Sequence, residues 1–405
     1  MALAGTSASK THLLYDVIVV GLGPGGAVAA TELARAGFSV LGLEGKAHPR
    51  YKVCGGGLSA RIGRLLDPDY RSVIEDTIHR VRFQFAGAEA FEIASPDPIA
   101  YMVMRARFDA YLARKAREAG AQVCENERVL AVREDAGGVE VETERGRYGA
   151  RILVGADGAN SLVARSLFPG RRGRLWGAVE CEVAVHQIPS GLGAGAIVLD
   201  IGVVPGGYAW VFPKEGRLSV GIAEFHGSGR NPKRSYERFV RGEPALAGIE
   251  VPCGMGHPIP LYGGAEGERM PLATNRALLV GDAAHLADPV LGEGIYYAVL
   301  SGKMAAACIS DRLRSVTPDL LAYDAQVAGE LYPEFRVAAR MAWTLFRFPQ
   351  ISHRVIRRRP GILELYAEVL KGRETYRSFY AKARTGAKDS FAHLLKDACL
   401  AAFKS

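Results

Sequence analysis

The sequence predicts an α/β protein built on a parallel sheet, with an antiparallel β-sheet domain inserted into it and a C-terminal helical region. Three stretches lead to this prediction. Residues 16–44 have the pattern of a strand, a glycine-rich turn, a helix and a second strand, whereas residues 176–225 alternate as short strands. Residues 314–405 read as helices, and the 405 residues suffice for two or three packed units.

The first of these stretches is a strand–helix–strand unit. Residues 17–20 are a β-branched apolar run, as expected of a buried parallel strand. Residues 27–36 are alanine-rich and helical in pattern, and Gly37 can end that helix. Residues 38–43 read as the second strand, with Glu44 at its tip. This order is that of a Rossmann-like βαβ unit.

Three glycines in this unit form the spacing G-x-G-x-x-G. Gly21 allows a tight turn after the strand, and Gly23 lets the backbone approach a pyrophosphate at the positive helix N-terminus. Gly26 lets helix and strand pack closely, and Glu44 can accept a hydrogen bond from a ribose hydroxyl. The unit therefore predicts binding of FAD or NAD; a glycine-rich loop without a ligand is the alternative.

A later strand ends beside a second group of glycines. Residues 277–280 read as a buried strand that ends in Gly281 and Asp282, and an aspartate there suits a ribityl chain. The segment from Gly292 to Ile295 opens a long helix that reaches about residue 307. Its backbone N–H groups can face a developing negative charge, such as the N1/O2 edge of a reduced flavin.

The remaining elements follow from alternation and from turn residues. A loop rich in glycine precedes a helix that we expect to start near Ser59. Residues 123–148 predict a meander of three short strands, with turns at 135–138 and 144–146. We expect further strands within residues 78–93 and at 151–154, 176–185, 195–203, 208–213 and 217–223, and helices at 105–118, around Arg165 and at 233–241.

Composition narrows the class of protein. Apolar runs stay shorter than the roughly 18 residues that a membrane span needs, and residues 1–12 read as a loose leader without the apolar core of a signal peptide. The spacing of the cysteines is not that of metal ligands, so we expect no metal site. We expect free thiols in a reducing cytosol, and hence a cytoplasmic protein. They are Cys54, Cys124, Cys181, Cys253, Cys308 and Cys399.

The net charge of +8 is concentrated in the C-terminal region. Residues 331–405 contain 15 Lys/Arg and 6 Asp/Glu, a surplus of +9 that leaves the rest of the chain near −1. A basic tail suits nucleic acid or an anionic membrane surface, and a solvated helical face is the alternative. We find no nucleic-acid-binding module, and therefore expect no nucleic-acid partner.

The order of the motifs resembles the flavoprotein monooxygenase-type FAD fold, the fold of p-hydroxybenzoate hydroxylase. The motifs are Gly21-x-Gly-x-x-Gly26 with Glu44, Arg105-x-x-Phe108-Asp109, Gly155-Ala-Asp157-Gly158 and Gly281-Asp282. Within that fold, the chain resembles the geranylgeranyl reductase family in Cys54-Gly-Gly-Gly57, Tyr208-Ala-Trp210-Val-Phe212-Pro213 and Asp288-Pro-Val-Leu-Gly-Glu-Gly-Ile295. The resemblance covers about residues 14–310.

The resemblance implies how the chain is divided and how it holds FAD. The FAD-binding domain would comprise residues 13–75, 99–172 and 268–313, the substrate-binding antiparallel sheet domain 76–98 and 173–267, and the helical region 314–405. The residues implied to contact FAD are Gly21, Gly23, Pro24, Gly25, Gly26, Glu44, Gly45, Lys46, Cys54, Gly55, Gly56, Gly57, Arg105, Val129, Asp157, Gly158, Gly281, Asp282, Gly292, Gly294 and Ile295.

The resemblance also implies hydrogenation of C=C bonds in geranylgeranyl or polyprenyl chains, carried by a lipid, a chlorophyll-type ester or a quinone. Such a reaction needs a proton donor, exclusion of water and an apolar slot. The implied catalytic residues are Cys54 and Tyr208, and the implied substrate residues are Tyr208, Trp210, Phe212 and Pro213. The alternatives are that Cys54 is a small residue at a crowded turn and that the aromatic strand is ordinary sheet core.

Three residues near the third motif have structural interpretations. His285 could relay protons, but a hydrogen-bonded structural histidine fits the sequence better. Asp288 with Pro289 shapes a turn, and Glu293 lies where a helix N-terminus favours a carboxylate.

Partners and competing functions complete the predictions. Because the chain has no second dinucleotide motif, NADPH, NADH or ferredoxin would reach the flavin transiently. Arg357, Arg358 and Arg359 lie near Trp343, Phe346 and Phe348 in sequence, which predicts peripheral contact with a membrane that holds the isoprenoid substrate. An FAD-dependent monooxygenase or halogenase of the same fold is the alternative function, and a non-enzymatic lipid or flavin carrier is a third.

Overall fold

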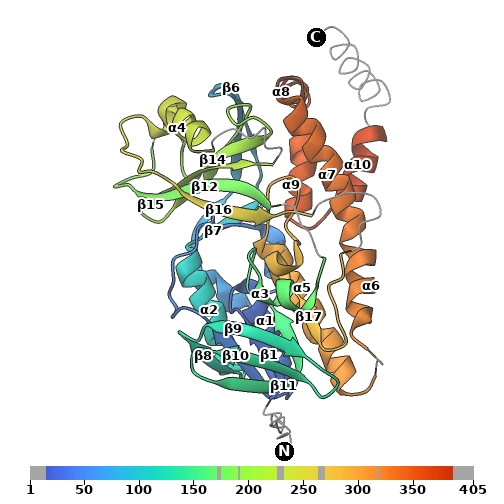
Figure 1. Cartoon of the computed structure of the whole chain (residues 1–405). Coiled ribbons are helices and arrows are strands. Elements are labelled where there is room, and N and C mark those ends of the chain that lie inside the picture. Colours follow the sequence, from blue (N-terminus) through green and yellow to red (C-terminus); the bar gives the residue numbers. More distant parts are fainter. Residues whose placement is uncertain are drawn as a thin grey trace, which may run out of the picture.

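The structure is a computed structural model that describes residues 15–170, 175–189, 192–225, 232–262, 270–316 and 319–385 (Figure 1). The predicted leader at residues 1–12 and the last cysteine, Cys399, lie outside these ranges. The described part contains two large sheets, a small sheet that joins them and a set of C-terminal helices, and helices pack on the mostly parallel first sheet as in other α/β folds.

The first large sheet has seven strands in the order β8-β2-β1-β11-β10-β9, with β17 paired to β11. Strands β1, β2, β8, β11 and β17 run parallel, and Val17, Ile18 and Val19 of β1 are fully buried, as their β-branched run predicted. The strands are β1 (Tyr15–Val20), β2 (Val40–Glu44), β8 (Gln122–Glu125), β9 (Val129–Glu134), β10 (Val139–Thr143), β11 (Arg147–Gly155) and β17 (Ala277–Leu279).

The predicted meander at residues 123–148 is wrong in its first strand. Strand β8 pairs in parallel with β2 at the far edge of the sheet, where Cys124 lies beside Leu43. The meander consists of β9, β10 and β11, with turns where we expected them. Local alternation identifies strands and turns, but the helix before β8 returns the chain to the opposite edge, which no short-range pattern reveals.

Helices cover this sheet and pack on each other through small residues. Helix α1 (Pro24–Arg35) begins three residues before its predicted start and packs on α5 (Ile295–Leu313), which extends beyond its predicted end. A Cβ atom at Gly302 of α5 would overlap the carbonyl oxygen of Gly25 in α1. Helices α2 (Arg105–Glu118) and α3 (Leu162–Leu167) form where the sequence predicted them.

The second large sheet also has seven strands, in the order β16-β12-β15-β14-β13-β5-β6. It is antiparallel as predicted, apart from the parallel pair of β13 and β5, and β16 was not predicted because its segment is rich in glycine and proline. The strands are β5 (Arg80–Phe85), β6 (Ala88–Ala94), β12 (Leu175–Ala184), β13 (Ala196–Ile201), β14 (Gly207–Lys214), β15 (Arg217–Glu224) and β16 (Met255–Pro260). Helix α4 (Pro232–Gly242) packs on β12 and β15.

A small sheet with the order β3-β7-β4 joins the two large ones. Its strands are β3 (Gly57–Ser59), β4 (Ile74–Ile78) and β7 (Ala100–Val103), and β4 runs across the predicted domain boundary at residues 75 and 76. A helix starts next to Ser59 as predicted, and it is a short 3₁₀ helix (Ala60–Arg64), because Ser59 itself pairs with β7 and stays extended. Further 3₁₀ helices lie at Pro68–Val73, Pro244–Leu246 and Gly281–Ala284.

The C-terminal region contacts both halves of the fold: its first helix packs on α5, and its later helices lie beside the second large sheet (Figure 1). Its helices are α6 (Leu321–Glu330), α7 (Tyr332–Arg347), α8 (Pro349–Arg358), α9 (Gly361–Leu370) and α10 (Tyr376–Thr385). The buried His353 of α8 lies among the rings of Phe83, Phe85 and Phe91, with centroid distances of 6.0, 5.9 and 5.6 Å. The C-terminal helices are therefore packed into the core of the fold and are not a separate tail.

Replacing Gly302 with alanine should destabilise the protein, because its Cβ atom would overlap the backbone of α1. We expect Gly302→Ala to lower the free energy of unfolding by about 1–3 kcal/mol. The control is Gly329→Ala in α6, where a Cβ atom would meet nothing within 4 Å. That change should stabilise the helix by about 0.5–1 kcal/mol. Denaturant unfolding of both variants tests this, and equal effects would contradict it.

Candidate functional site

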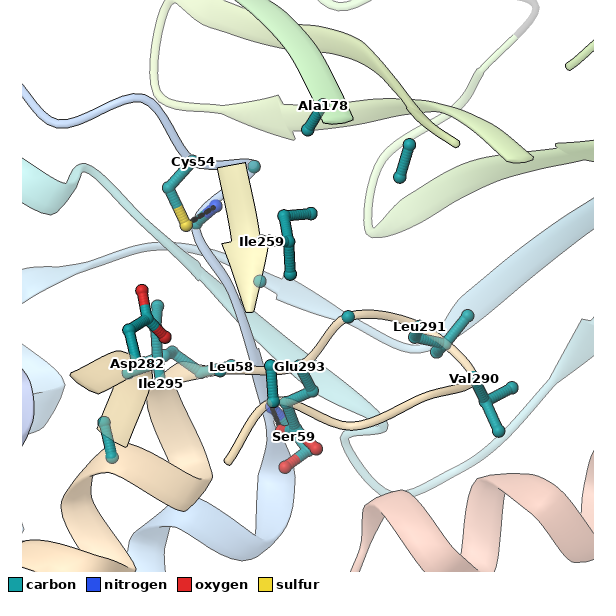
Figure 2. A pocket seen from close by; sticks show the side chains of 18 of the residues that line it. Cys54, Leu58, Ser59, Ala178, Ile259, Asp282, Val290, Leu291, Glu293 and Ile295 are labelled. Atoms are coloured by element: carbon teal, nitrogen blue, oxygen red, sulfur yellow. Dashed lines mark hydrogen bonds between the residues drawn. The ribbon is translucent and has the colours of Figure 1, made fainter. Parts of the chain in front are cut away.

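A cavity of about 1590 Å³ lies where the two large sheets and the C-terminal helices meet. Residues from separate segments border it, and Figure 2 shows Cys54, Ala178 and Leu291 on three of them. Apart from Gly26, every residue that the sequence predicted to contact FAD lines this cavity. The fold therefore brings together motifs that lie as far apart in sequence as residues 21 and 295.

The glycine-rich turn forms one end of the cavity. Gly21 has φ +91°, in the region that favours glycine, and Gly23 caps the N-terminus of α1. A Cβ atom at Gly23 would approach only Arg50, at 3.8 Å, so the turn leaves room beside the helix N-terminus. Gly26 does not line the cavity: a Cβ atom there would overlap the carbonyl oxygen of Gly21, so its role is packing.

A buried network of charges stands next to this turn. Glu44 accepts hydrogen bonds from the Leu22 backbone N–H (3.0 Å) and from Arg50 (3.2 Å). Arg50 also pairs with Asp109 at 3.1 Å, and Arg105 donates to both carboxylate oxygens of Asp109 at 2.9 Å. Burial disfavours the charge of Arg105, but its interactions with Asp109 and Cys54 together outweigh burial and raise the pKa of the guanidinium.

Two further aspartates, both predicted to contact FAD, line the cavity. Asp157 accepts hydrogen bonds from the hydroxyl of Ser161 and the backbone N–H of Leu162, at 2.5 and 2.6 Å, and so caps the start of α3. Burial raises the pKa of Asp157. Burial also raises the pKa of Asp282, against the opposing charges of Lys52 and Arg105.

The Cys54 loop faces the aromatic strand. The Cys54 Sγ atom accepts a hydrogen bond from the Gly56 backbone N–H at 3.4 Å (Figure 2). A Cβ atom at Gly55 would lie 3.1 Å from the Phe212 ring and 3.2 Å from the indole nitrogen of Trp210. A side chain at position 55 would therefore crowd the aromatic residues of β14, and the glycine lets the loop pack closely on this strand.

Tyr208, Trp210 and Phe212 form an aromatic wall along β14, and all three line the cavity as predicted, whereas Pro213 does not. The ring centroids of Trp210 lie 5.8 Å from those of both Tyr208 and Phe212. The Tyr208 hydroxyl donates to the Leu291 carbonyl at 2.6 Å, and burial raises its pKa. The hydroxyl proton of Tyr208 is therefore held by the Leu291 carbonyl.

The loop before α5 is held by its own polar side chains. Asp288 accepts from the backbone N–H groups of Val290 and Leu291, at 2.8 and 3.0 Å, and so shapes the turn. The Glu293 carboxylate binds Arg61 and the backbone N–H of Ser59, which differs from the predicted role at the helix N-terminus. His285 ends a 3₁₀ helix with φ +56° and is not among the cavity-lining residues.

The second large sheet adds polar residues that the sequence analysis missed. Glu180 of β12 lines the cavity and accepts hydrogen bonds from the hydroxyls of Tyr51 and Ser219, both at 3.2 Å. Lys52 contacts His257, whose pKa falls to about 4 because of burial and the charges of Lys52 and Arg105. Isolated polar residues on alternating strands give no motif, so spacing alone could not have found them.

The C-terminal helices close the cavity. Phe346 of α7 stacks on Tyr208 at 6.2 Å and is buried, so the prediction that it lies at a membrane boundary is wrong. Trp343, on another face of α7, lines the cavity and is 51% exposed. Arg336, Arg340 and Arg359 also line this region and are exposed. Helical residues with no local motif thus border the site.

The comparisons with known proteins agree with this geometry. A family model described as an FAD binding domain matches residues 14–322. A digeranylgeranylglycerophospholipid reductase from Methanopyrus kandleri is 34% identical over 310 residues, which are 72% of this chain and 79% of the relative. The chain belongs to the geranylgeranyl reductase family of FAD-dependent oxidoreductases. A menaquinone reductase from Mycolicibacterium smegmatis is 29% identical over 88% of this chain and 91% of its own.

Solved structures show the same fold. A geranylgeranyl bacteriochlorophyll reductase-like protein from Thermoplasma acidophilum has a TM-score of 0.70 and 26% identity, over 84% of this chain and 91% of its own. The flavin-dependent brominase Bmp2 has a TM-score of 0.70 and 20% identity, over 93% of this chain and all of its own. At 20% identity, the similarity to the brominase is evidence for a shared fold only.

The cavity of this geranylgeranyl reductase family member fits FAD at the end formed by the glycine-rich turn. The Nε atom of Arg50 is buried and has no hydrogen-bond partner within the described residues, and it belongs to a cation beside Gly23 and the N-terminus of α1. An anionic pyrophosphate would satisfy both the guanidinium and the helix N–H groups. Arg50 was missed because it lies in a loop after Glu44 without a recognised spacing.

Within the described ranges, no helix is both long and apolar enough to cross a bilayer. The same part of the chain has no group of three or more His, Cys, Asp or Glu residues placed to hold a metal ion. The five cysteines in these ranges are free thiols.

We expect Arg50→Met to weaken FAD binding about 10- to 100-fold, because it removes a charge-assisted hydrogen bond to the pyrophosphate. Titration of apoprotein with FAD, followed by flavin fluorescence, measures the change. The control is Arg238→Met on the exposed face of α4, outside the cavity, which should leave the affinity unchanged. Equal affinity in Arg50→Met and the wild type would remove Arg50 from the FAD site.

Proposed function

We propose that this protein is an FAD-dependent reductase that hydrogenates C=C bonds of geranylgeranyl or polyprenyl chains, in a lipid, a chlorophyll-type ester or a quinone. The observation that carries the proposal is the shape of the cavity. It extends from the glycine-rich turn, past the Cys54 loop, to an apolar space between the aromatic strand β14 and helices α7 to α10. A flat cofactor at one end and a long apolar chain at the other match that arrangement.

The apolar part is suited to a large rigid substrate. Val81, Phe83, Ile93, Ile197 and Leu199 line it from the second sheet, together with the aromatic wall. Ile356, Leu363 and Leu370 line it from α8 and α9. Reduced FAD supplies a hydride when bound. These side chains would align the double bond and keep water away from the reaction.

Cys54 and Tyr208 have different proposed roles. Cys54 lies in the glycine loop next to the predicted FAD contacts, so its thiol can contact the reacting groups. Tyr208 is better suited to holding the aromatic wall against the loop before α5, since its hydroxyl donates to Leu291. The cofactor contacts that we assign to Gly21, Glu44, Arg105 and the other cavity-lining residues are part of the same proposal.

The electron donor reaches the flavin transiently in this proposal. Because the sequence contains a single G-x-G-x-x-G motif, NADPH, NADH or ferredoxin would bind for reduction and then leave. We propose a cytoplasmic location with contact to a membrane surface through the C-terminal helices. No nucleic-acid partner is part of this proposal.

An anaerobic reoxidation experiment tests the function. The FAD-loaded protein is reduced with dithionite and mixed with geranylgeranyl diphosphate or a geranylgeranylated lipid. We expect the absorbance of oxidised flavin to return and the chain to gain two hydrogens per flavin, because hydride and proton add to one double bond. A flavin that stays reduced until oxygen enters, and then oxygenates or halogenates an added aromatic compound, would favour the monooxygenase or halogenase alternative.

Membrane contact has its own test. Trp343 is 51% exposed beside the cavity, and Arg347 lies 5.4 Å from the ring of Phe348. We expect the protein to sediment with anionic liposomes at low salt and less so at high salt, because exposed charges are screened. Trp343→Ala should reduce binding, whereas Leu130→Ala, at a residue of similar exposure (49%) on β9, should not. Equal sedimentation with neutral and anionic vesicles would contradict the electrostatic part.

A further inference from the structure

The proposed reduction needs a proton as well as a hydride. The carboxyl groups that line the cavity are candidates for the proton donor. Five of the six lie on segments of the FAD-binding half: Glu44, Glu127, Asp157, Asp282 and Glu293. Four of these five are committed to other partners, and the fifth, Asp282, is the one that we assign to the ribityl chain of FAD. Glu44 and Glu293 pair with arginines, Glu127 binds Arg145 and Thr143, and Asp157 caps α3. The sixth, Glu180, lies on the sheet that faces the apolar part.

The register of the sheet places Glu180 beside the aromatic wall. Glu180 of β12 pairs with Gly221 of β15, and Gly221 pairs with Trp210 of β14. The three residues therefore form one row on one face of the sheet. A Cβ atom at Gly221 would overlap the Trp210 ring, so the glycine lets the indole lie flat across β15 towards Glu180.

A hydrogen-bond network connects Glu180 to this indole and to Tyr51, which also lines the cavity. The Trp210 Nε1–H donates to Ser219 Oγ at 3.2 Å, and the Ser219 hydroxyl donates to Glu180 Oε1 at 3.2 Å. The Tyr51 hydroxyl donates to Glu180 Oε2 at 3.2 Å, and the Tyr51 side chain is 46% exposed. Both hydroxyls can also accept a hydrogen bond, so the network can serve either charge state of the carboxyl.

Burial is the main reason why the carboxyl of Glu180 binds a proton more readily than an exposed glutamate does. Burial raises its pKa to about 7, and the neighbouring Glu182 carboxylate adds to this rise. Lys214, which pairs with Glu182, and the two hydroxyls oppose it. Other groups that face this part of β12 are His257 of β16, opposite Ala178 in register, with its partner Lys52, and Tyr236 of α4, near Cys181.

We propose that Glu180 is the proton donor for the reduction and that it regains its proton from solvent through Tyr51. The inference rests on the proposed function. In this step the O–H bond of Glu180 breaks, and the electron pair of the C=C bond forms a new C–H bond with that proton. The neighbouring carbon receives the hydride from reduced FAD. The alkene gains two electrons, the cofactor is oxidised, and Glu180 remains as a carboxylate.

The test compares two carboxyl-to-amide changes in the same sheet. Glu180→Gln removes the proposed proton donor with little change in shape. Asp200→Asn is the matched control: Asp200 of β13 is buried, and its pKa is raised to about 6 by burial, but it does not line the cavity. Pre-reduced proteins are mixed with geranylgeranyl diphosphate without oxygen, and flavin reoxidation in a single turnover is followed from pH 5 to 9.

We expect the rate of the wild type to fall about tenfold per pH unit above roughly pH 7, because the donor must be protonated. Glu180→Gln should be about 10²- to 10⁴-fold slower and lose this pH dependence, whereas Asp200→Asn should keep both the rate and the profile. Tyr51→Phe removes a hydrogen bond to the carboxylate, so the fall in rate should move to higher pH.

A readout independent of turnover accompanies the kinetics. Infrared difference spectra of the apoproteins between pH 5 and 9 should show the loss of two protonated carboxyl bands in the wild type, one near pH 6 from Asp200 and one near pH 7 from Glu180. Asp200→Asn should lack only the first loss and Glu180→Gln only the second. Reoxidation of Glu180→Gln at the wild-type rate, or an unchanged loss near pH 7 in its spectra, would overturn the role of Glu180 alone. A wild type that transfers no hydrogen to the chain would overturn the proposed function, and the donor role with it.

Discussion

The packing of α1 on α5 is the constraint on which the site depends. Gly25 and Gly302 let the two helices approach so closely that a single methyl group at Gly302 would overlap the backbone. Both helices begin at the cavity, at Pro24 and Ile295, so their positive N-terminal ends face the same space. A cofactor with a pyrophosphate and a flavin that gains negative charge on reduction would be stabilised at both ends by this one contact.

The buried charges next to the cavity are stable because they are paired. Asp109 lies between Arg50 and Arg105, and Glu44 lies between Arg50 and a backbone N–H. Removing a charge from water costs several kcal/mol unless partners compensate it. The network holds Arg50 in place while its Nε atom remains without a partner within the described residues, which prepares that cation for an anion.

The second half of the site has an aromatic wall that would separate water from the proposed apolar chain. The adjacent rings of Tyr208, Trp210 and Phe212 extend from the Cys54 loop to Phe346 of α7, so the C-terminal helices complete the wall that β14 begins. Within this wall Glu180 is 1% exposed and has hydroxyl partners. Proton supply and exclusion of water can therefore coexist in one cavity.

The sequence by itself determined the cofactor end of the protein. The spacing of Gly21, Gly23 and Gly26, the acidic Glu44 and the Gly-Asp strand ends are local requirements of a turn and of helix starts, so they are visible in short stretches. The aromatic strand was visible for the same reason, because alternation places its residues on one face.

Only the tertiary structure decided which distant residues complete the site. Arg50 joins the charge network, Glu180 aligns with Trp210 through Gly221, and the C-terminal helices close the apolar space. The same holds for β8, whose sequence predicts a strand but not its partner β2. Strand order and helix docking are set by the free energy of burying whole surfaces, which is a property of the assembled fold and leaves no local pattern in the chain.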